Sequence, residues 1–348
     1  MNLLDEKDAL ILATARSTRQ LASTAAASTG LSRVAVSRRI KRLADTGYLH
    51  RVGSGTRQTY TPGQNQFWKL TAPREAVARA GGEFGMWEAH LSPLMAEVTP
   101  NVANIANIGF TEMLNNALDH SDAQALCMAV HIYNGRLQMA VMDDGMGIFR
   151  KIAEALVLFD DRLAMLELAK GKFTTAASGH SGMGVFVASR MLDGFAITSR
   201  GLTFDPRPAA ERLAAFDWVD TSPYANGTVV RMDMALDSKR TAQAVYLRYF
   251  SPDESGGDAF HTTEVPVRLA QLSSQLTSRS QGKWVVERAT QFKTVVLDFE
   301  GVEMVGQAFV DEVFRVFAFA HPEVQLKAIH LKPAVARMLQ LFAPHFTP

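Results

Sequence analysis

The sequence has a single cysteine, no long uncharged apolar run and almost no net charge. One cysteine, Cys127, among 348 residues excludes an internal disulfide framework and is typical of a reducing compartment. Its apolar neighbours predict that it is buried in a core. No uncharged stretch approaches the roughly 18 residues of a membrane helix, and the acidic start, residues 1–8, lacks a signal-peptide core. We therefore expect a cytoplasmic protein with no membrane partner.

The composition is that of an ordinary globular protein. Hydrophobic residues make up 47% and charged residues 20% of the chain, and the length predicts two or three domains. The formal net charge of +1 favours no class of partner over the whole chain. Only local charge patterns can therefore indicate what the protein binds.

A predicted helix over residues 110–121 carries the first polar pair. Apolar residues at 110, 113, 114, 117 and 118 have helical spacing, so Glu112 and Asn116 share one face. A carboxamide oxygen beside a carboxylate suits a magnesium–phosphate site, because Mg²⁺ prefers oxygen ligands and keeps most of its waters. The carboxylate can orient or deprotonate an attacking water.

Two glycine-containing segments follow. The predicted strand 137–142 ends at Asp143, whose carboxylate can accept a hydrogen bond from an exocyclic amine, and Gly145 and Gly147 allow close approach of a flat ligand. Residues 178–185 lead into an apolar helix, and free amides at a helix start suit phosphate. Each segment alone is typical of an ordinary turn, but the ordered set predicts a nucleotide pocket. The glycine-rich segment contributes Gly182, Met183 and Gly184.

Two lysines precede the glycine-rich segment. A helix is expected over residues 153–169, ending at Gly171. Lys170 and Lys172 then either bind a γ-phosphate or belong to a solvated basic turn, and both interpretations stay open. Residues 201–225 are expected to supply strands and a loop.

Residues 100–240 are predicted to form one domain, of which residues 100–235 resemble the GHKL ATPases, the family of gyrase B subunits, ninety-kilodalton heat-shock chaperones, mismatch-repair ATPases and histidine kinases. The resemblance implies a Bergerat α/β sandwich that binds ATP and Mg²⁺, with Glu112 as base, Asn116 on the metal and Asp143 on adenine. Gly145 and Gly147 would lie beside the base, and Thr228 would support the adenine contact. Asp119 replaces the lysine of many histidine kinases, which favours an ATP-hydrolysing switch, whereas His120–Ser121 is kinase-like.

The N-terminal residues 1–62 are predicted to form three helices, 5–15, 18–28 and 33–46, and a hairpin around residues 53–55. This order resembles the winged helix-turn-helix regulators of bacteria. Ten basic against four acidic residues give the segment a charge of about +6, which favours phosphate contacts with double-stranded DNA. Some winged helices bind protein instead. The resemblance implies DNA contacts from Ser32, Arg33, Ser37, Arg38, Arg51 and Arg57.

Residues 63–99 are expected to form a helical connector. Phe67–Leu70 and Phe84–Trp87 supply large apolar groups in a predicted helical setting, either for a dimer face or for packing on the ATP-binding module. His90 vaguely resembles the phosphoacceptor of histidine kinases, but the acidic residue that normally follows is absent.

The C-terminal residues 255–348 alternate strands, 292–299 and 324–331, with helices that begin at 306 and 333, which predicts a small α/β domain. The segments 279–281, 297–299 and 309–312 resemble the STAS-like domains fused to GHKL modules. Residues 301–320 contain no Ser or Thr, so the usual phosphoacceptor of anti-sigma antagonists is absent. We expect an interaction or dimerisation module, in which Asp298, Asp311 and Glu312 contact a partner or cap a helix.

Together these features predict a multidomain α+β protein: a winged helix-turn-helix, a GHKL α/β sandwich and a STAS-like α/β domain. The expected function is that of an ATP-switched transcription regulator, a homo-oligomer with possible slow ATP hydrolysis and a protein partner for the STAS-like domain. The alternatives are an anti-sigma-type serine/threonine kinase acting on a separate protein, and a scaffold without nucleotide binding.

Overall fold

The computed structural model of the chain describes residues 4–18, 20–54, 58–170, 184–207, 216–251, 261–262 and 264–346. These residues form two compact units. The first comprises the described residues of Met1–Ile148, Leu192–Asp205 and Arg212–Arg240, and the second those of Phe149–Met191, Pro206–Glu211 and Thr241–Pro348. The chain is a multidomain α+β protein, in which each unit has its own sheet.

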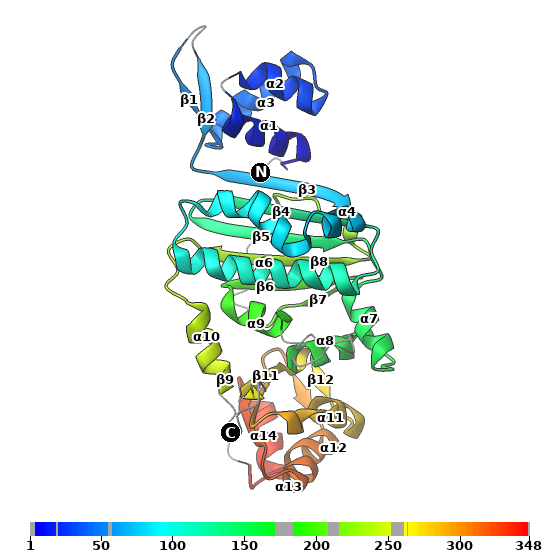
Figure 1. Cartoon of the computed structure of the whole chain (residues 1–348). Helices are drawn as coiled ribbons and strands as arrows, with labels where there is room; N and C mark the ends of the chain where they lie inside the picture. Colours follow the sequence, from blue (N-terminus) through cyan, green and yellow to red (C-terminus); the bar gives the residue numbers. More distant parts are fainter. Residues whose placement is uncertain are drawn as a thin grey trace. The chain divides into compact units, whose positions relative to one another are not determined.

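The first unit begins with three helices and a β-hairpin, as the sequence predicts (Figure 1). Asp5 and Ser32 cap two of the helices by accepting hydrogen bonds from the amides of Asp8 and Ala35. The second helix begins three residues later than predicted, at Leu21. The elements are α1 (Glu6–Ser17), α2 (Leu21–Thr29), α3 (Arg33–Asp45), β1 (Leu49–Val52) and β2 (Thr59–Pro62).

A six-stranded antiparallel sheet forms the centre of the first unit, in the order β3-β4-β5-β8-β6-β7. The long helix α6 (Pro100–His120) lies across one face of the sheet (Figure 1). Gly109 allows close approach, because a Cβ there would lie 3.3 Å from Leu192 Cδ1 and 3.4 Å from Met232 Sδ. The strands are β3 (Gln66–Pro73), β4 (Ala125–Tyr133), β5 (Arg136–Asp143), β6 (Gly194–Ser199), β7 (Leu202–Phe204) and β8 (Thr228–Ala235).

The opposite face of the sheet shares a core with the three N-terminal helices. Cys127 on β4 and Ala140 and Met142 on β5 belong to one buried cluster with Leu12 and Leu43 of the helices. Both faces of β4 and β5 are therefore covered, which explains their near-continuous apolar sequences. The predicted burial of Cys127 is confirmed.

The predicted helical setting of Phe67–Leu70 is wrong, because these residues lie in β3 and pair along the strand with β4. Pairing with a neighbouring strand, which local sequence does not reveal, overrides the local pattern. The helical setting of Phe84–Trp87 is confirmed: α4 (Arg74–Arg79) and α5 (Gly82–Met86) precede a π-helical turn (Trp87–Leu91) and a 3₁₀ turn (Ser92–Met95).

Only three residues join β2 to β3, and hydrogen bonds fasten them to the end of α3. The amides of Gly63 and Asn65 donate to the carbonyl oxygens of Tyr48 (2.9 Å) and Gly47 (3.1 Å). The Asn65 side chain donates to the carbonyl oxygen of Thr46 at 2.9 Å. Hydrogen bonds therefore hold the connection between the hairpin and the edge strand β3 in place against the end of α3.

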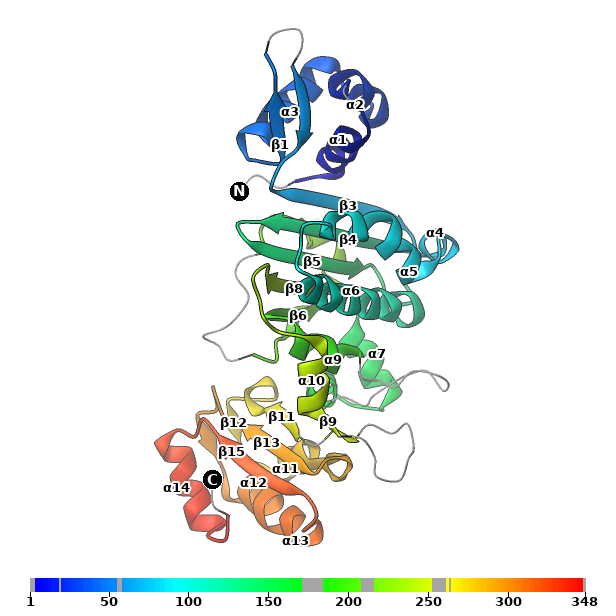
Figure 2. The ribbon, with the colours of Figure 1, turned by 60° about the vertical axis from the view of Figure 1, so that its left-hand side comes forward.

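The second unit contains a three-stranded parallel sheet in the order β11-β13-β15 (Figure 2). The strands and helices predicted after residue 290 are all present. The elements are β11 (Glu264–Arg268), β12 (Gln275–Leu276), α11 (Arg279–Val286), β13 (Thr294–Asp298), β14 (Met304–Val305), α12 (Gln307–Asp311), a π-helical turn (Glu312–Phe317), α13 (Ala318–Ala320), β15 (Gln325–Ile329) and α14 (Pro333–Phe342).

The helix predicted over residues 153–169 is two helices, α7 (Ile148–Ala155) and α8 (Asp161–Lys170). Val157, between the two helices, has a φ of 55°, a left-handed conformation that β-branched residues rarely adopt, so its residue type does not predict the break. The remaining elements are α9 (Gly184–Met191), α10 (Ala242–Tyr249), β9 (Phe250–Ser251), β10 (His261–Thr262) and 3₁₀ turns at Ser222–Tyr224, Leu269–Gln271 and Ala289–Gln291.

Candidate functional site

Asp143 ends β5 as a buried carboxylate, with 4% of its surface exposed. Its Oδ1 accepts a hydrogen bond from the Gly145 amide at 3.0 Å. Thr228, its register partner on β8, also hydrogen-bonds to it. Burial raises the pKa of Asp143 to about 6, against these hydrogen bonds, which lower it. The partners shown for this carboxylate are neutral donors.

The two glycines after Asp143 are required by close contacts within the protein. A Cβ at Gly145 would lie 2.0 Å from the Ser121 carbonyl oxygen. Gly147 has a φ of +91°, and a Cβ there would lie 2.4 Å from Ser199 Oγ. The sequence predicts that these glycines allow a flat ligand to approach closely, and the structure adds a packing requirement at both positions.

Thr228 connects the strand-end carboxylate to the start of α7. Its Oγ1 accepts a hydrogen bond from the Ile148 amide at 3.1 Å, while its side chain also bonds to Asp143. A Cβ at Gly227 would lie 2.0 Å from the Asp143 carbonyl oxygen, so β8 and the end of β5 are in tight contact. The sequence-predicted residues Asp143, Gly145, Gly147 and Thr228 are therefore brought together at one end of the sheet.

Glu112 and Asn116 lie on α6 as the spacing predicts, with Glu112 exposed and Asn116 half-buried. The opposite face of the helix is buried through Phe110, Met113 and Leu114 among others. The helix ends against the Asp143 loop, since the Met146 amide donates to the Ser121 carbonyl oxygen at 3.3 Å. The helix that carries Glu112 and Asn116 is therefore in direct contact with the loop that follows Asp143.

The two adjacent aspartates after β5 have different roles. Asp144 is exposed, and its Oδ1 accepts hydrogen bonds from the amides of Gln124 and Ala125 at 2.8 and 3.0 Å. It thus closes the turn that leads into β4, whereas Asp143 is buried at the strand end. Among the described residues, no group of three or more His, Cys, Asp or Glu side chains has the geometry of a metal site.

Lys170 does not have the exposure expected of a phosphate ligand. Its buried ammonium group donates to Glu167 Oε1 at 2.6 Å and to the carbonyl oxygens of Trp284 and Glu287 at 3.0 and 2.7 Å. Arg288 Nη1 lies 3.0 Å from Glu167 Oε2. These contacts join α8 to the end of α11 and bury the Lys170 ammonium group within the protein, instead of leaving it exposed to a phosphate. Gly184 begins α9, and Lys172, Gly182, Met183 and Arg57 lie outside the described residues.

Helix α3 presents an exposed face with Ser32, Arg33, Ser37 and Arg38, opposite buried Val36, Ile40 and Leu43. Arg51 on β1 is also exposed. Ser32 Oγ is occupied as the helix cap. The face therefore has the residues that the sequence reasoning assigned to base and phosphate contacts.

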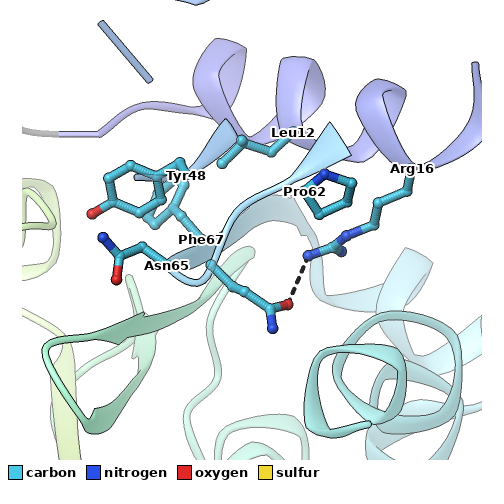
Figure 3. Close-up of a pocket in the computed structure, with 7 residues that line it drawn as sticks. Leu12, Arg16, Tyr48, Pro62, Asn65 and Phe67 are labelled. Carbon is cyan, nitrogen blue, oxygen red and sulfur yellow. Dashed lines mark hydrogen bonds between the residues drawn. The ribbon is translucent and has the colours of Figure 1, made fainter. Parts of the chain in front are cut away.

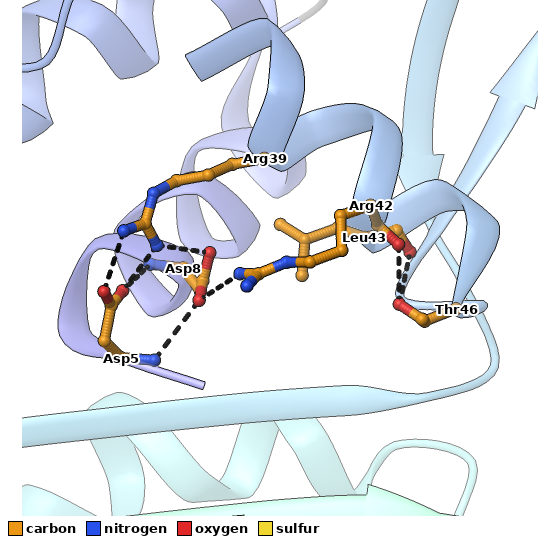
Figure 4. A network of polar contacts seen from close by, with 6 residues as sticks. All are labelled: Asp5, Asp8, Arg39, Arg42, Leu43 and Thr46. Carbon is orange, nitrogen blue, oxygen red and sulfur yellow. Dashed lines mark hydrogen bonds and ion pairs between the residues drawn. The ribbon is translucent and has the colours of Figure 1, made fainter. Parts of the chain in front are cut away.

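Two other arginines of α3 are engaged by acidic residues of α1 (Figure 4). Arg39 Nη1 lies 2.8 Å from both Asp5 Oδ1 and Asp8 Oδ1, and Arg42 Nη2 lies 2.5 Å from Asp8 Oδ2. Asp8 is fully buried. Four of the charges behind the predicted +6 thus hold α1 against α3, which leaves Arg33 and Arg38 as the exposed basic residues at the start of α3.

A buried aromatic cluster, which sequence reasoning missed, joins the N-terminal helices to the sheet. Tyr48 Oη lies 2.6 Å from His131 Nε2 on β4, and the His131 ring also packs on Trp218 at 5.0 Å. Burial lowers the pKa of His131 to about 4, opposed by the charge of Asp217. No sequence motif marks these residues, because they meet only after β3 joins the sheet.

A small cleft beside this cluster lies between α1 and β3 (Figure 3). Arg16 Nη2 of α1 donates to Gln66 Oε1 of β3 across it at 3.0 Å. The cleft is lined by Leu12, Arg16, Tyr48, Pro62, Asn65, Gln66 and Phe67.

Comparison with known proteins identifies one region. A family model described as a STAS-like domain of unknown function (DUF4325) matches residues 281–336, which confirms the STAS-like prediction for the C-terminal segment. No curated protein matches the chain. Within the described part of the chain, no helix combines the length and apolar character needed to span a membrane.

Proposed function

We propose that the first unit binds ATP with Mg²⁺ and that nucleotide binding sets the affinity of the N-terminal helices for double-stranded DNA. The observation that carries the proposal is Asp143, a buried strand-end carboxylate with neutral hydrogen-bond donors. A buried carboxylate of this kind is stabilised by a further donor, and the exocyclic amine of adenine is one. Perturbed ionisable groups in such settings indicate functional sites.

The contacting residues fit the roles that the GHKL resemblance implies. Asn116 would supply one oxygen to Mg²⁺, and phosphate oxygens and waters would supply the others, so the site needs no cluster of carboxylates. Glu112, one helical turn away on α6, would orient or deprotonate water in a slow hydrolysis reaction. Asp143 would accept from adenine, with Thr228 fixing its position.

The DNA-binding part of the proposal rests on the exposed face of α3. Winged helix-turn-helix proteins place such a helix in the major groove, where Arg33, Ser37 and Arg38 would contact base edges. Arg51 on the hairpin would meet the phosphate backbone. Arg39 and Arg42 are paired with α1 and hold α3 in place. This supports a separate DNA-contacting role for the exposed arginines of α3.

The aromatic cluster offers a physical route between the two sites. β5, which carries Asp143, pairs with β4, which carries His131, and His131 contacts Tyr48 next to α3. If nucleotide binding shifts the end of β5, the shift would pass to β4 through the strand pairing and then to Tyr48, next to α3, through His131. Coupling of this kind is typically worth about 1–3 kcal/mol.

Calorimetric titration of the full chain with ATP and Mg²⁺, repeated with DNA present, tests the proposal. Asp143→Asn and Asn116→Ala should abolish binding, and Glu112→Ala should retain binding but lose turnover. Asp144→Asn is the matched control, because Asp144 closes a turn and should leave affinity unchanged. Absence of adenine-nucleotide affinity in the unmodified chain would refute the proposal.

The STAS-like match keeps one alternative open, an anti-sigma-type kinase that phosphorylates Ser or Thr on a separate protein. Incubation with γ-labelled ATP and lysate separates the two. Label on a second protein at Ser or Thr favours the kinase, whereas released or retained phosphate favours the switch.

A further inference from the structure

A second cluster of ionisable residues lies in the STAS-like region, at the carboxyl edge of the parallel sheet. Arg268 ends β11 and is the register partner of Asp298, which ends β13. Asp298 is in turn paired with Ile329, the last residue of β15, and His330 follows directly. Side chains that follow adjacent parallel strands gather at one edge, which is where α/β sheets bind ligands and place reactive groups.

The geometry of His330 fixes which of its ring nitrogens is reactive. His330 Nδ1 lies 2.8 Å from Asp298 Oδ1. An ionised carboxylate can only accept, so Nδ1 carries the hydrogen and the lone pair of the neutral ring is on Nε2. The side chain is 52% exposed, which leaves room for a reagent. Its backbone is left-handed, with a φ of 54°, a conformation that is uncommon outside glycine.

The carboxylate that orients this ring is itself held. Asp298 is buried, and its Oδ1 also accepts from the Glu300 amide at 2.9 Å. Arg268 Nε lies 3.7 Å from Asp298 Oδ2, and Arg268 Nη2 lies 2.6 Å from Glu300 Oε2. Asp298 therefore cannot turn away from His330 without breaking several contacts, and it acts as a positioning residue.

The matched segment offers no hydroxyl where STAS-type antagonists carry a phosphoacceptor serine, because residues 301–320 lack Ser and Thr. His330 lies within the same match, at the end of the neighbouring strand. A second exposed histidine nearby provides a contrast: His321 Nδ1 lies 3.2 Å from Glu323, a carboxylate with 60% of its side chain exposed. Of these two histidines, His330 is the one with a buried carboxylate behind it that other contacts hold in place.

We propose that His330 Nε2 is a phosphoryl-acceptor site. The Nε2 lone pair attacks phosphorus, an N–P bond forms, and the bond from phosphorus to the leaving group breaks. The leaving group is ADP when the donor is a nucleoside triphosphate, and ammonia, which carries away a proton, when the donor is phosphoramidate. Asp298 keeps the proton on Nδ1 and stabilises the positive charge that develops on the ring. That ATP is the biological donor rests on the proposed function above, whereas the acceptor site does not.

The acceptor site is tested with potassium phosphoramidate on the unmodified full chain, without nucleotide. Peptide mass spectrometry under neutral conditions measures the rate of phosphorylation at each of the nine histidines. His330 should react about tenfold or more faster than His321, because the carboxylate that orients its ring is buried and held in place, whereas Glu323 is exposed. Equal rates at the two would overturn the proposal, and this comparison needs no variant.

Two variants sharpen the result. His330→Gln should remove the fast site and leave the rate at His321 unchanged. Asp298→Asn should slow His330 selectively, with His321 in the same molecules as internal reference and circular dichroism as the check on folding. A folded Asp298→Asn chain with an unchanged rate at His330 would refute the positioning role.

The donor is tested separately by incubation with γ-labelled ATP and Mg²⁺. Acid-labile, base-stable label that His330→Gln removes supports ATP as donor. If phosphoramidate labels His330 quickly but ATP does not label it, the acceptor site is supported and ATP is refuted as its donor in this chain. ATP binding measured by calorimetry without labelling would leave the proposed function intact.

Discussion

Each unit has a strand that ends in a buried aspartate. The two carboxylates differ in the charge of their hydrogen-bond and ion-pair partners. Asp143 in the antiparallel sheet has neutral donors, and its pKa is raised to about 6. Asp298 in the parallel sheet faces Arg268 and His330. Burial of a carboxylate without a cation costs stability, and such a cost is typical of a position that serves a ligand. A paired carboxylate instead holds a neighbouring side chain in one orientation.

The largest expected effect comes from breaking a paired cluster in the second unit. Glu167→Gln leaves the buried Lys170 and the half-buried Arg288 without their shared carboxylate, which should lower the free energy of unfolding by about 3–5 kcal/mol. Urea denaturation measures the change in the free energy of unfolding, and hydrogen exchange of the α8 amides locates it in the structure.

The control is Glu154→Gln, which removes an exposed partner of Arg150 in the same unit and should change little. Glu167→Gln combined with Lys170→Met should recover much of the loss, because it removes both buried charges. A wild-type stability for Glu167→Gln would contradict the view that this unit depends on paired charges.

Replacing the aspartate by asparagine at the two strand ends should change the free energy of unfolding in opposite directions. The folded pKa of Asp143 is above its unfolded value of 3.8, so the folded state loses stability as pH rises from 3.8 to 6. Asp143→Asn should therefore raise the free energy of unfolding at pH 7 by about 3 kcal/mol, and the gain should disappear below pH 4. Asp298→Asn should instead lower it, since Arg268 loses one of its two carboxylate partners and His330 loses its charged partner.

Denaturation of both variants at pH 4 and pH 7 provides the measurement. An Asp143→Asn chain that is less stable than wild type at pH 7 would show that this carboxylate is compensated like Asp298.

His131 gives the opposite pH dependence in the same unit as Asp143. Its folded pKa of about 4 is below the unfolded value of 6.5, so stability is lost as pH falls from 6.5 through 4. The full loss is about 3 kcal/mol below pH 4. NMR titration of the His131 ring, with Tyr48→Phe as a variant that removes its hydrogen-bond partner, measures the midpoint. A midpoint near 6.5 in the unmodified chain would contradict burial of a neutral ring.

The smallest effect concerns the exposed face of α3. Arg38→Ala should weaken binding to a duplex that the unmodified chain selects from random sequence by about 1–3 kcal/mol, as one lost base contact does. Arg79→Ala, an exposed arginine on α4, is the matched change of charge and should preserve affinity. Equal affinity for both variants, measured at one salt concentration, would remove Arg38 from the interface.

Local patterns in the sequence predicted the elements that carry their own signals. Ser32 marked the start of α3, and apolar spacing placed Glu112 and Asn116 on one face of α6. The alternation of strands and helices after residue 290 was sufficient to predict the C-terminal fold.

Features that depend on distant partners could not be predicted in this way. β3 was mistaken for a helix because its pairing with β4 involves residues about sixty positions away, as in Lys69 with Ala129. The partner of Lys170 includes carbonyl oxygens more than one hundred residues further along the chain. The left-handed conformation of Val157, two residues after the end of α7, is likewise not indicated by the local sequence.

The short, hydrogen-bonded connection between β2 and β3 has a practical consequence for dissecting this protein. Cutting the chain at residue 62 would separate the three N-terminal helices from the sheet against which Tyr48 is buried, so such a fragment should aggregate or unfold. A stable isolated fragment that contains these helices has to include β3 and a replacement for the β4 surface.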